Sequence, residues 1–147
     1  QEPHGRICAL TPAEVLTVPI EDLQKAMRKD EPLMLNFMQR LIAETDWLRE
    51  AVMGLARLNS RDRIIYYFGQ MRRRQIAFGK LDPQASSYEM PITQRHLATM
   101  VGISDIHANR LTRDLDDSGL LTLRSKTITI PDVELFEETF ETLTVPL

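Results

Sequence analysis

The stretch that decides the fold runs from Thr93 to Leu115 and has the sequence TQRHLATMVGISDIHANRLTRDL. Thr93 is a good N-cap for a first helix, and Gly102 ends that helix because glycine accepts the positive φ of a tight turn. Ile103 then fills the space between two helices, and Ser104 caps the second one. The side chains expected to be buried are Leu97, Ala98 and Val101 in the first helix and Ala108, Leu111 and Leu115 in the second. This pattern predicts a helix-turn-helix.

A β-hairpin is predicted directly after the second helix, which Ser118-Gly119 ends. Leu120 to Ile130 alternates apolar and polar residues in two short runs around the basic tip Arg124-Ser125-Lys126. A hairpin in this position makes the domain a winged helix-turn-helix. Pro131-Asp132 then opens a terminal helix. The residues of that helix expected to pack back on the domain are Val133, Phe136, Phe140 and Leu143.

Upstream of the helix-turn-helix, a further helix is predicted to begin at Ser60, which we take as its N-cap. It runs through Ile64, Ile65 and Phe68 and stops at Gly79. The segment from Lys80 to Pro91 shows no apolar period and contains turn-forming residues. We therefore expect a loop there.

A long helix is predicted before Asn59, opening at Asp30-Glu31-Pro32. Its apolar residues recur with alternating steps of four and three, which is typical of a helix-on-helix seam. This ladder consists of Met34, Met38, Leu41, Thr45, Leu48, Val52 and Leu55. We interpret it as a dimer interface. The apolar residues off the ladder, which are expected to pack on their own domain, are Leu35, Phe37, Ile42 and Trp47. The alternative is that the ladder itself packs on that domain.

The N-terminal segment from Gln1 to Leu23 has short β-branched stretches interrupted by Pro12 and Pro19. It predicts one or two strands separated by a turn. Two strands alone are unstable, so the segment is expected to be the end of a larger β domain or to pair with a second copy.

Length and composition describe a soluble globular chain of one or two small domains. The chain has 147 residues, of which 43% are hydrophobic and 27% charged. No run of eighteen apolar residues exists, and Gln1 to His4 show neither the charged nor the apolar region of a leader peptide, so no membrane partner is expected. The single cysteine fits a reducing environment, so we expect a cytoplasmic location. The start without Met suggests a fragment. A lone cysteine, Cys8, makes no intramolecular disulfide.

Charge is distributed unevenly along the chain. Its formal net charge is −3, which by itself argues against a nucleic-acid partner. However, residues 57–80 carry seven basic side chains against one acidic, whereas residues 132–147 carry five acidic side chains and no basic one. Arg72, Arg73 and Arg74 either add contacts to phosphate or only solvate their helix. Both options remain open.

The chemistry-bearing residues do not form a catalytic or metal-binding pattern. The three histidines, His4, His96 and His107, have no metal-ligand spacing, and no glycine-rich phosphate loop or nucleophile motif is present. We therefore expect a protein that is not an enzyme.

Taken in order, these segments resemble the Crp/Fnr family of bacterial transcription regulators. The residues that carry the resemblance are Asp62-Arg63-Ile64, Leu97-Ala98, Val101 to Ser104, Asn109 to Leu111, Leu115 and Gly119 to Leu121. The resemblance implies a mainly α fold in three parts: residues 1–30 as the last strands and exit helix of an effector-sensing β-barrel, residues 31–59 as the dimerisation helix, and residues 60–147 as the winged helix-turn-helix. It also implies a homodimer that binds double-stranded DNA and contacts RNA polymerase.

Departures from the family bear on the effector. Members that bind cyclic AMP carry an Arg-Ser pair before the strand that corresponds to residues 6–10, where this chain has Pro3-His4-Gly5. They also carry a Thr-Ser pair in the dimer helix, and the corresponding turn near Trp47 has none. Both differences argue against cyclic AMP. Cys8 alone cannot ligate an iron–sulfur cluster, so no cofactor is expected in this segment and the effector remains unidentified.

Residues near the N-terminus of a recognition helix point into the major groove. The predicted base contacts are Ile106, His107, Asn109, Arg110 and Arg113, with a phosphate contact as the alternative for Asn109. Arg110 is suited to bidentate contact with guanine, although an ion pair with Asp114 is the alternative. Ile106 stands where the family commonly has Glu, and it is suited to a thymine methyl group rather than to cytosine.

The predicted phosphate contacts lie at helix N-termini and on the wing. They are Thr93, Gln94, Arg95, Ser104, Arg124 and Lys126. A two-fold dimer would place two recognition helices about 34 Å apart, so the operator should be a near-palindrome. The alternative function is a winged helix that binds another protein and has no specific DNA site.

Overall fold

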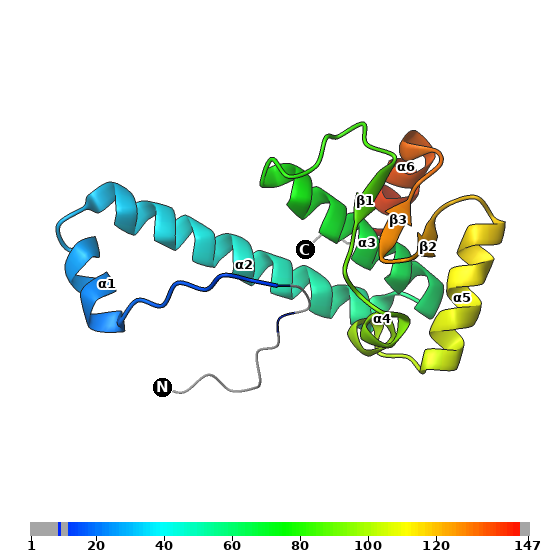
Figure 1. Ribbon diagram of the computed structural model, residues 1–147, viewed down its shortest axis with the longest axis horizontal. Coiled ribbons are helices and arrows are strands. Elements are labelled where there is room, and N and C mark those ends of the chain that lie inside the picture. Colours follow the sequence, from blue (N-terminus) through cyan, green and yellow to red (C-terminus); the bar gives the residue numbers. More distant parts are fainter. Residues whose placement is uncertain (1–8, 10–11, 145–147) are drawn as a thin grey trace. The chain divides into compact units, whose positions relative to one another are not determined.

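The computed structural model describes Ala9 and residues 12–144, and Figure 1 shows its helices and strands. The chain divides into two compact units, Gln1–Glu50 and Ala51–Leu147. The helices are α1 (Ile20–Met27), α2 (Glu31–Arg57), α3 (Ser60–Ala77), α4 (Gln94–Val101), α5 (Asp105–Asp117) and α6 (Val133–Leu143), and the strands are β1 (Ser87–Glu89), β2 (Thr122–Arg124) and β3 (Thr127–Thr129). The predicted mainly α class with a winged helix-turn-helix is confirmed.

The N-terminal segment differs from the predicted strands. Residues 1–8 and 10–11 lie outside the described part of the chain, and residues 12–19 form no strand. Ile20 begins α1, with Glu21 and Asp22 in its first turn, where acidic side chains stabilise a helix. The strand prediction is therefore wrong for residues 12–19, whereas α1 lies within residues 1–30, where the family resemblance implies an exit helix. A strand needs a partner strand, and the sheet of the described residues, β1-β3-β2, offers none to this segment.

The long helix α2 begins where the sequence places it. The carboxylate of Asp30 accepts a hydrogen bond from the backbone N–H of Leu33 at 2.9 Å. Pro32 lies in the first turn, where backbone N–H groups have no acceptor within the helix, so the N–H that proline lacks costs no hydrogen bond. The helix then continues for 27 residues to Arg57.

The ladder of α2 is exposed along its whole length. The exposed members are Met34, Met38, Leu41, Thr45, Leu48, Val52 and Leu55. Leu35, Phe37 and Ile42 are exposed as well, so the expectation that they pack on their own domain is wrong within the described chain, whereas Trp47 is partly buried. Of the residues of α2, Gly54 alone is buried. The helix therefore carries far more uncovered apolar surface than scattered surface residues would give.

Helix α3 is capped by Asn59 rather than by Ser60, which corrects the prediction. The Asn59 Oδ1 accepts hydrogen bonds from the N–H groups of Arg61 and Asp62, both at 3.0 Å. Its Nδ2 donates to the Asp62 carboxylate at 2.6 Å. Ser60 is already the first helical residue, so its side chain is not in the capping position. Gly79 follows the end of the helix, as predicted.

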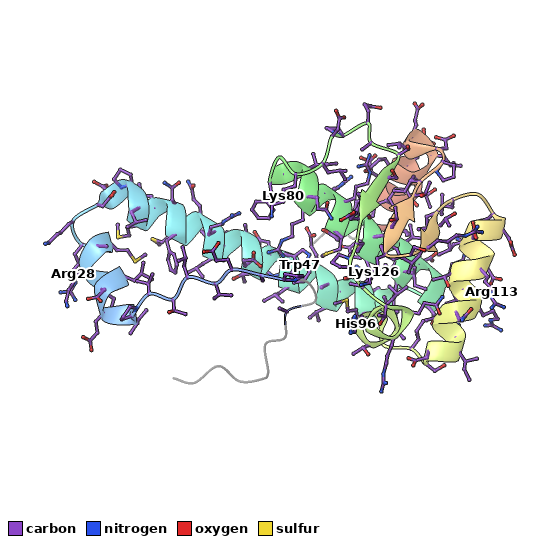
Figure 2. The ribbon with its side chains drawn as sticks, in the orientation of Figure 1. Arg28, Trp47, Lys80, His96, Arg113 and Lys126 are labelled. Atoms are coloured by element: carbon purple, nitrogen blue, oxygen red, sulfur yellow. The ribbon has the colours of Figure 1, made fainter. Side chains whose placement is uncertain are left out.

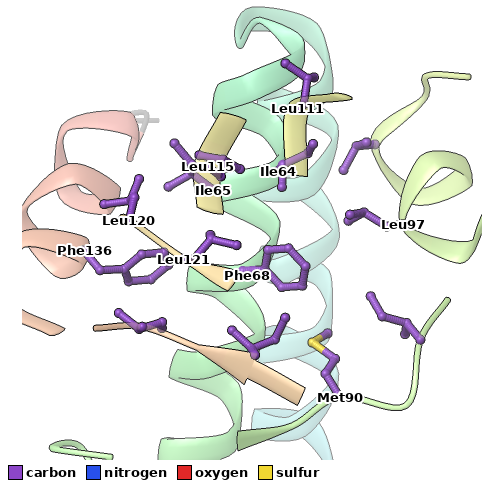
Figure 3. Packing of buried hydrophobic residues seen from close by; sticks show 14 of the residues in the cluster. Ile64, Ile65, Phe68, Met90, Leu97, Leu111, Leu115, Leu120, Leu121 and Phe136 are labelled. Atoms are coloured by element: carbon purple, nitrogen blue, oxygen red, sulfur yellow. The ribbon is translucent and has the colours of Figure 1, made fainter. Parts of the chain in front are cut away.

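The core of the second unit forms around one face of α3. Ile64, Ile65 and Phe68 are completely buried. Figure 3 shows these side chains surrounded by Leu97 from α4, Leu115 from α5 and residues of the sheet and α6. Each large apolar side chain that is fully buried contributes about 1.5–3 kcal/mol. Three helices and the sheet are therefore held on α3 mainly by apolar burial.

A three-stranded antiparallel sheet has the order β1-β3-β2. The predicted hairpin is confirmed as β2 and β3, joined by Ser125 and Lys126 with φ values of 49° and 65°, as expected for a two-residue primed turn. The predicted loop from Lys80 to Pro91 is wrong in part, because it contains β1. In β1 only Tyr88 is buried, opposite Ile128. Three residues are too few to show an alternating pattern in the sequence.

The basic middle of the chain pairs with its acidic end. Arg72 is completely buried; its Nη2 donates to the Pro83 carbonyl at 2.6 Å, and its Nε lies 3.2 Å from the Glu137 Oε1. Arg73 donates to Glu141 at 3.2 Å, and its guanidinium lies 4.4 Å from the centre of the Phe140 ring. Arg72 therefore neither contacts solvent nor is available to phosphate. These arginines help to hold α6 on the domain.

Helices α3 and α6 approach closely at Gly69. A Cβ atom at this position would overlap the ring of Phe140, so the ring or one of the helices would have to shift. Phe140 is itself fully buried, as the sequence predicts. The absence of a side chain at Gly69 therefore sets the distance between the two helices.

Asn59→Ala should destabilise the protein by about 1 kcal/mol because two N–H groups of α3 lose their acceptor. Ser60→Ala is the matched control and should change the free energy of unfolding by less than about 0.5 kcal/mol. Urea unfolding of both variants measures the difference. Equal losses, or a larger loss for Ser60→Ala, would contradict the assignment of Asn59 as the cap.

Gly69→Ala should destabilise the protein by about 1–3 kcal/mol because its new methyl group overlaps Phe140. In a Phe140→Ala background the same change should be neutral or stabilising by up to about 1 kcal/mol, since alanine is the better helix former. Thermal unfolding of the two single variants and the double variant tests this reversal of sign. A loss of the same size in both backgrounds would exclude the overlap as its cause.

Candidate nucleic-acid interface

The two helices of the helix-turn-helix are fixed by local hydrogen bonds at their ends. The Thr93 hydroxyl accepts from the His96 N–H at 3.2 Å, while His96 Nδ1 accepts from the Thr93 N–H at 3.3 Å. Gly102 has φ +69°, and the Ser104 hydroxyl accepts from the His107 N–H at 3.3 Å. The predicted caps and the predicted turn are confirmed.

Packing sets how α5 lies against α4. All six residues predicted to face the inside are buried: Leu97, Ala98, Val101, Ala108, Leu111 and Leu115. Ile103 is partly buried against the same cluster. Arg63 on α3 adds polar contacts, because its Nε donates to the Leu58 carbonyl at 2.8 Å and its Nη1 to the Val101 carbonyl at 3.3 Å. The turn at Gly102 is thereby joined to the beginning of α3.

The outer face of α5 carries the side chains that the sequence predicts as base contacts. Ile106 is 85% exposed, and Arg110 and Arg113 are exposed on the same side at helical spacing. Figure 2 shows Arg113 projecting from α5. A shallow groove runs over this face; its lining residues are Ile106, Asn109, Arg110, Arg113, Asp114 and Asp117. Such an arrangement of apolar and guanidinium groups can contact base edges.

Arg110 lies beside His107 on this face. Its Nη2 is 3.4 Å from the His107 Nε2. Among the ion pairs of the described residues, the alternative pair between Arg110 and Asp114 is not formed. The guanidinium therefore remains exposed and available for a ligand.

Asn109 is held by a hydrogen-bonded chain that crosses from α5 to α4. Its Nδ2 donates to the Gln94 Oε1 at 3.1 Å, and the Gln94 Nε2 donates to the Thr112 hydroxyl at 3.5 Å. Thr112 is buried and donates to the Ala108 carbonyl at 3.0 Å. Sequence reasoning missed Thr112. The available signal was a hydroxyl next to Leu111 on the buried side of the recognition helix.

Arg124 on the wing is paired with Asp116 on α5. Asp116 Oδ2 accepts from the Arg124 Nη2 and its Oδ1 accepts from the Thr122 hydroxyl, both at 2.6 Å. These hydrogen bonds, that of Thr122 above all, hold the pKa of Asp116 below its usual range, and Asp116 raises the pKa of Arg124. Sequence reasoning did not identify Asp116. Its partners lie six and eight residues away, so no helical spacing indicates them.

The structure brings together some of the predicted contacts and leaves others apart. One depression of about 280 Å³ is lined by Gln94, Asn109, Thr112, Arg113, Asp116, Leu123 and Arg124. Ser104 lies at the first turn of α5, Thr93 and Arg95 at the beginning of α4, and Lys126 at the tip of the wing. The last three are exposed outside this depression.

Two further findings concern other kinds of site. Among the described residues, no three His, Cys, Asp or Glu side chains gather in a group suited to a metal ion. No helix in the described ranges combines the length and apolar composition that crossing a membrane requires.

Comparison of the sequence with known proteins gives relatives of one kind. The Global nitrogen regulator of Synechocystis sp. (strain ATCC 27184 / PCC 6803 / Kazusa) is 26% identical over 125 residues, which cover 83% of this chain and 53% of that protein. The protein of the same name from Synechococcus elongatus (strain ATCC 33912 / PCC 7942 / FACHB-805) is 27% identical over 125 residues, covering 83% and 54%. This chain thus spans about half the length of the curated relatives it matches.

Solved structures show the same fold. FixK2 from Bradyrhizobium japonicum superimposes with a TM-score of 0.68 at 17% identity, covering 86% of this chain and 59% of that one. A CooA mutant from Carboxydothermus hydrogenoformans superimposes with a TM-score of 0.66 at 20% identity, covering 81% and 54%. The family model of the Crp-like helix-turn-helix domain matches residues 62–139, more than half of the chain. The chain therefore belongs to the Crp/Fnr family, with a Crp-like helix-turn-helix domain.

Proposed function

We propose that this chain is the DNA-binding part of a transcription regulator and that α5 enters the major groove of double-stranded DNA. The observation that carries this proposal is the exposed face of Ile106, Arg110 and Arg113 on a capped helix in a helix-turn-helix. The curated relatives, named as nitrogen regulators, support the same general role.

Base recognition is assigned to the first two turns of α5 and to Arg113, which follows them. Arg110 donates two hydrogen bonds to guanine O6 and N7, the commonest specific contact of an arginine. Ile106 packs on a thymine methyl group, while His107 and Arg113 reach neighbouring bases. Asn109 contacts a base through its remaining amide atoms, because one N–H already serves Gln94.

Phosphates on either side of the groove would be bound by α4 and the wing. The N-terminus of α4, with Thr93, Gln94 and Arg95, carries the partial positive charge of a helix N-terminus, which attracts phosphate. Ser104 and Lys126 lie at the beginning of α5 and at the tip of the wing. These contacts position the protein and carry no sequence information.

The exposed ladder of α2 provides the dimer interface of this proposal. Its apolar residues are separated by steps of three and four, as in a two-stranded helical seam. A two-fold dimer places the recognition helices about 34 Å apart, so the operator is a near-palindrome with half-sites one turn apart.

The remaining assignments concern the whole protein. An effector other than cyclic AMP would bind a barrel preceding α2 and shift the population of two dimer geometries. RNA polymerase is the expected protein partner and the cytoplasm the expected location, both by family resemblance. No cofactor is assigned to the present chain.

Selection of duplexes from a random pool should recover a near-palindrome with the wild-type chain. Arg110→Ala should lower affinity for that duplex by about 1–3 kcal/mol because the bidentate contact is lost, and selectivity should relax at one base pair of each half-site. Arg28→Ala, at the C-cap that follows α1, removes the same charge and should leave the selected sequence unchanged. If folded wild-type protein selects no sequence, the winged helix serves another macromolecule, and the DNA proposal fails.

Leu41→Glu should abolish the dimer in sedimentation equilibrium because it places charges in the centre of the seam. Affinity for the selected duplex should then fall roughly 100-fold, since one half-site no longer raises the effective concentration at the other. Ile42→Glu is the matched control, as it introduces the same charge one residue away from the ladder on an equally apolar side chain. A monomeric wild type, or a dimer insensitive to Leu41→Glu, would contradict the proposed seam.

A further inference from the structure

Three side chains tie the wing to the end of α5. Both carboxylate oxygens of Asp116 are used, one by the Thr122 hydroxyl and one by the Arg124 guanidinium, each at 2.6 Å. The Asp116 side chain is 29% exposed, whereas the side chain of Arg124 is 77% exposed. The cation of this pair therefore faces the solvent, with the carboxylate partly covered behind it.

The position of Arg124 creates a competition with any phosphate that approaches. Arg124 lines the same depression as Gln94, Asn109 and Arg113, which all belong to the surface assigned to DNA. The hydrogen bond between Arg124 and Asp116 joins two ionised groups, and such bonds are about twice as strong as bonds between neutral groups. A phosphate that binds Arg124 must therefore replace a strong hydrogen bond to the carboxylate. The carboxylate also neutralises a charge that would attract DNA of every sequence.

We propose that Asp116 is a positioning residue that competes with DNA phosphate for Arg124 and thereby limits binding of this chain to DNA of any sequence. The inference rests on the proposed function, because it concerns the same surface. Thr122 contributes by holding the carboxylate against the wing. Arg124 becomes a full phosphate contact only where a phosphate lies close enough to replace the carboxylate.

Affinity for a short duplex of random sequence, measured by fluorescence anisotropy at several salt concentrations, tests the competition. Asp116→Asn should bind roughly threefold to tenfold more tightly near 0.1 M salt, with a salt slope steeper by about 1, as expected for one additional phosphate contact. Thr122→Val changes no charge and should act in the same direction with a smaller effect. Because Thr122→Val keeps the net charge, tighter binding by this variant comes from the release of Arg124 and not from the loss of a negative charge.

Two controls decide whether Arg124 is the residue released. Asp117→Asn removes the same charge from the adjacent, exposed position of α5 and should have a clearly smaller effect. In an Arg124→Gln background, the effect of Asp116→Asn should shrink to that of Asp117→Asn.

Several outcomes would overturn the inference. They are an undiminished effect of Asp116→Asn in the Arg124→Gln background, no effect of Thr122→Val, and weaker binding by Asp116→Asn. If the wild type binds the duplex, any of these three outcomes refutes the inference and leaves the proposed function intact. A folded wild type that binds no duplex at any salt concentration removes the proposed function and this inference with it.

Discussion

The second unit depends on the burial of one face of α3. Ile64, Ile65 and Phe68 are inaccessible to solvent, and α4, α5, the sheet and α6 all contribute side chains to the cluster around them. Because interiors are close-packed, the position of each surrounding element is set by the volume of its neighbours. The absent side chain of Gly69 shows the same constraint at α6. The exposed face of α5 is therefore presented by a rigid support.

Polar contacts refine this support at the surface assigned to DNA. Arg63 joins α3 to the Val101 carbonyl at the end of α4, and Gln94 joins α4 to Asn109 on α5. Asp116 joins α5 to the wing. Each contact connects two elements that apolar packing has already brought together. The result is a surface whose side chains are oriented before any ligand arrives, which lowers the cost of binding.

Much of the fold was predictable because its signals are local. A cap, a glycine turn and a buried face lie within a few residues, so Thr93, Gly102 and Ser104 indicate the helix-turn-helix without tertiary information. The choice between Asn59 and Ser60 was not predictable in this way. Both residue types cap helices well, and the backbone decides which side chain reaches the free N–H groups. The strand at Tyr88 likewise depends on β3, a partner about forty residues away.

By itself, the sequence determined the helices α2 to α6, the turn at Gly102, the wing and the set of exposed residues on α5. These follow from periodicity and capping, which act over one or two turns of chain. Only the tertiary structure decided which charges are free. Arg72 and Arg124 look equivalent as basic residues in the sequence, yet Arg72 is buried against Glu137 and Arg124 is paired with Asp116 on the surface. The physical reason is that an ion pair requires proximity in space, which packing of distant elements creates and local spacing does not reveal.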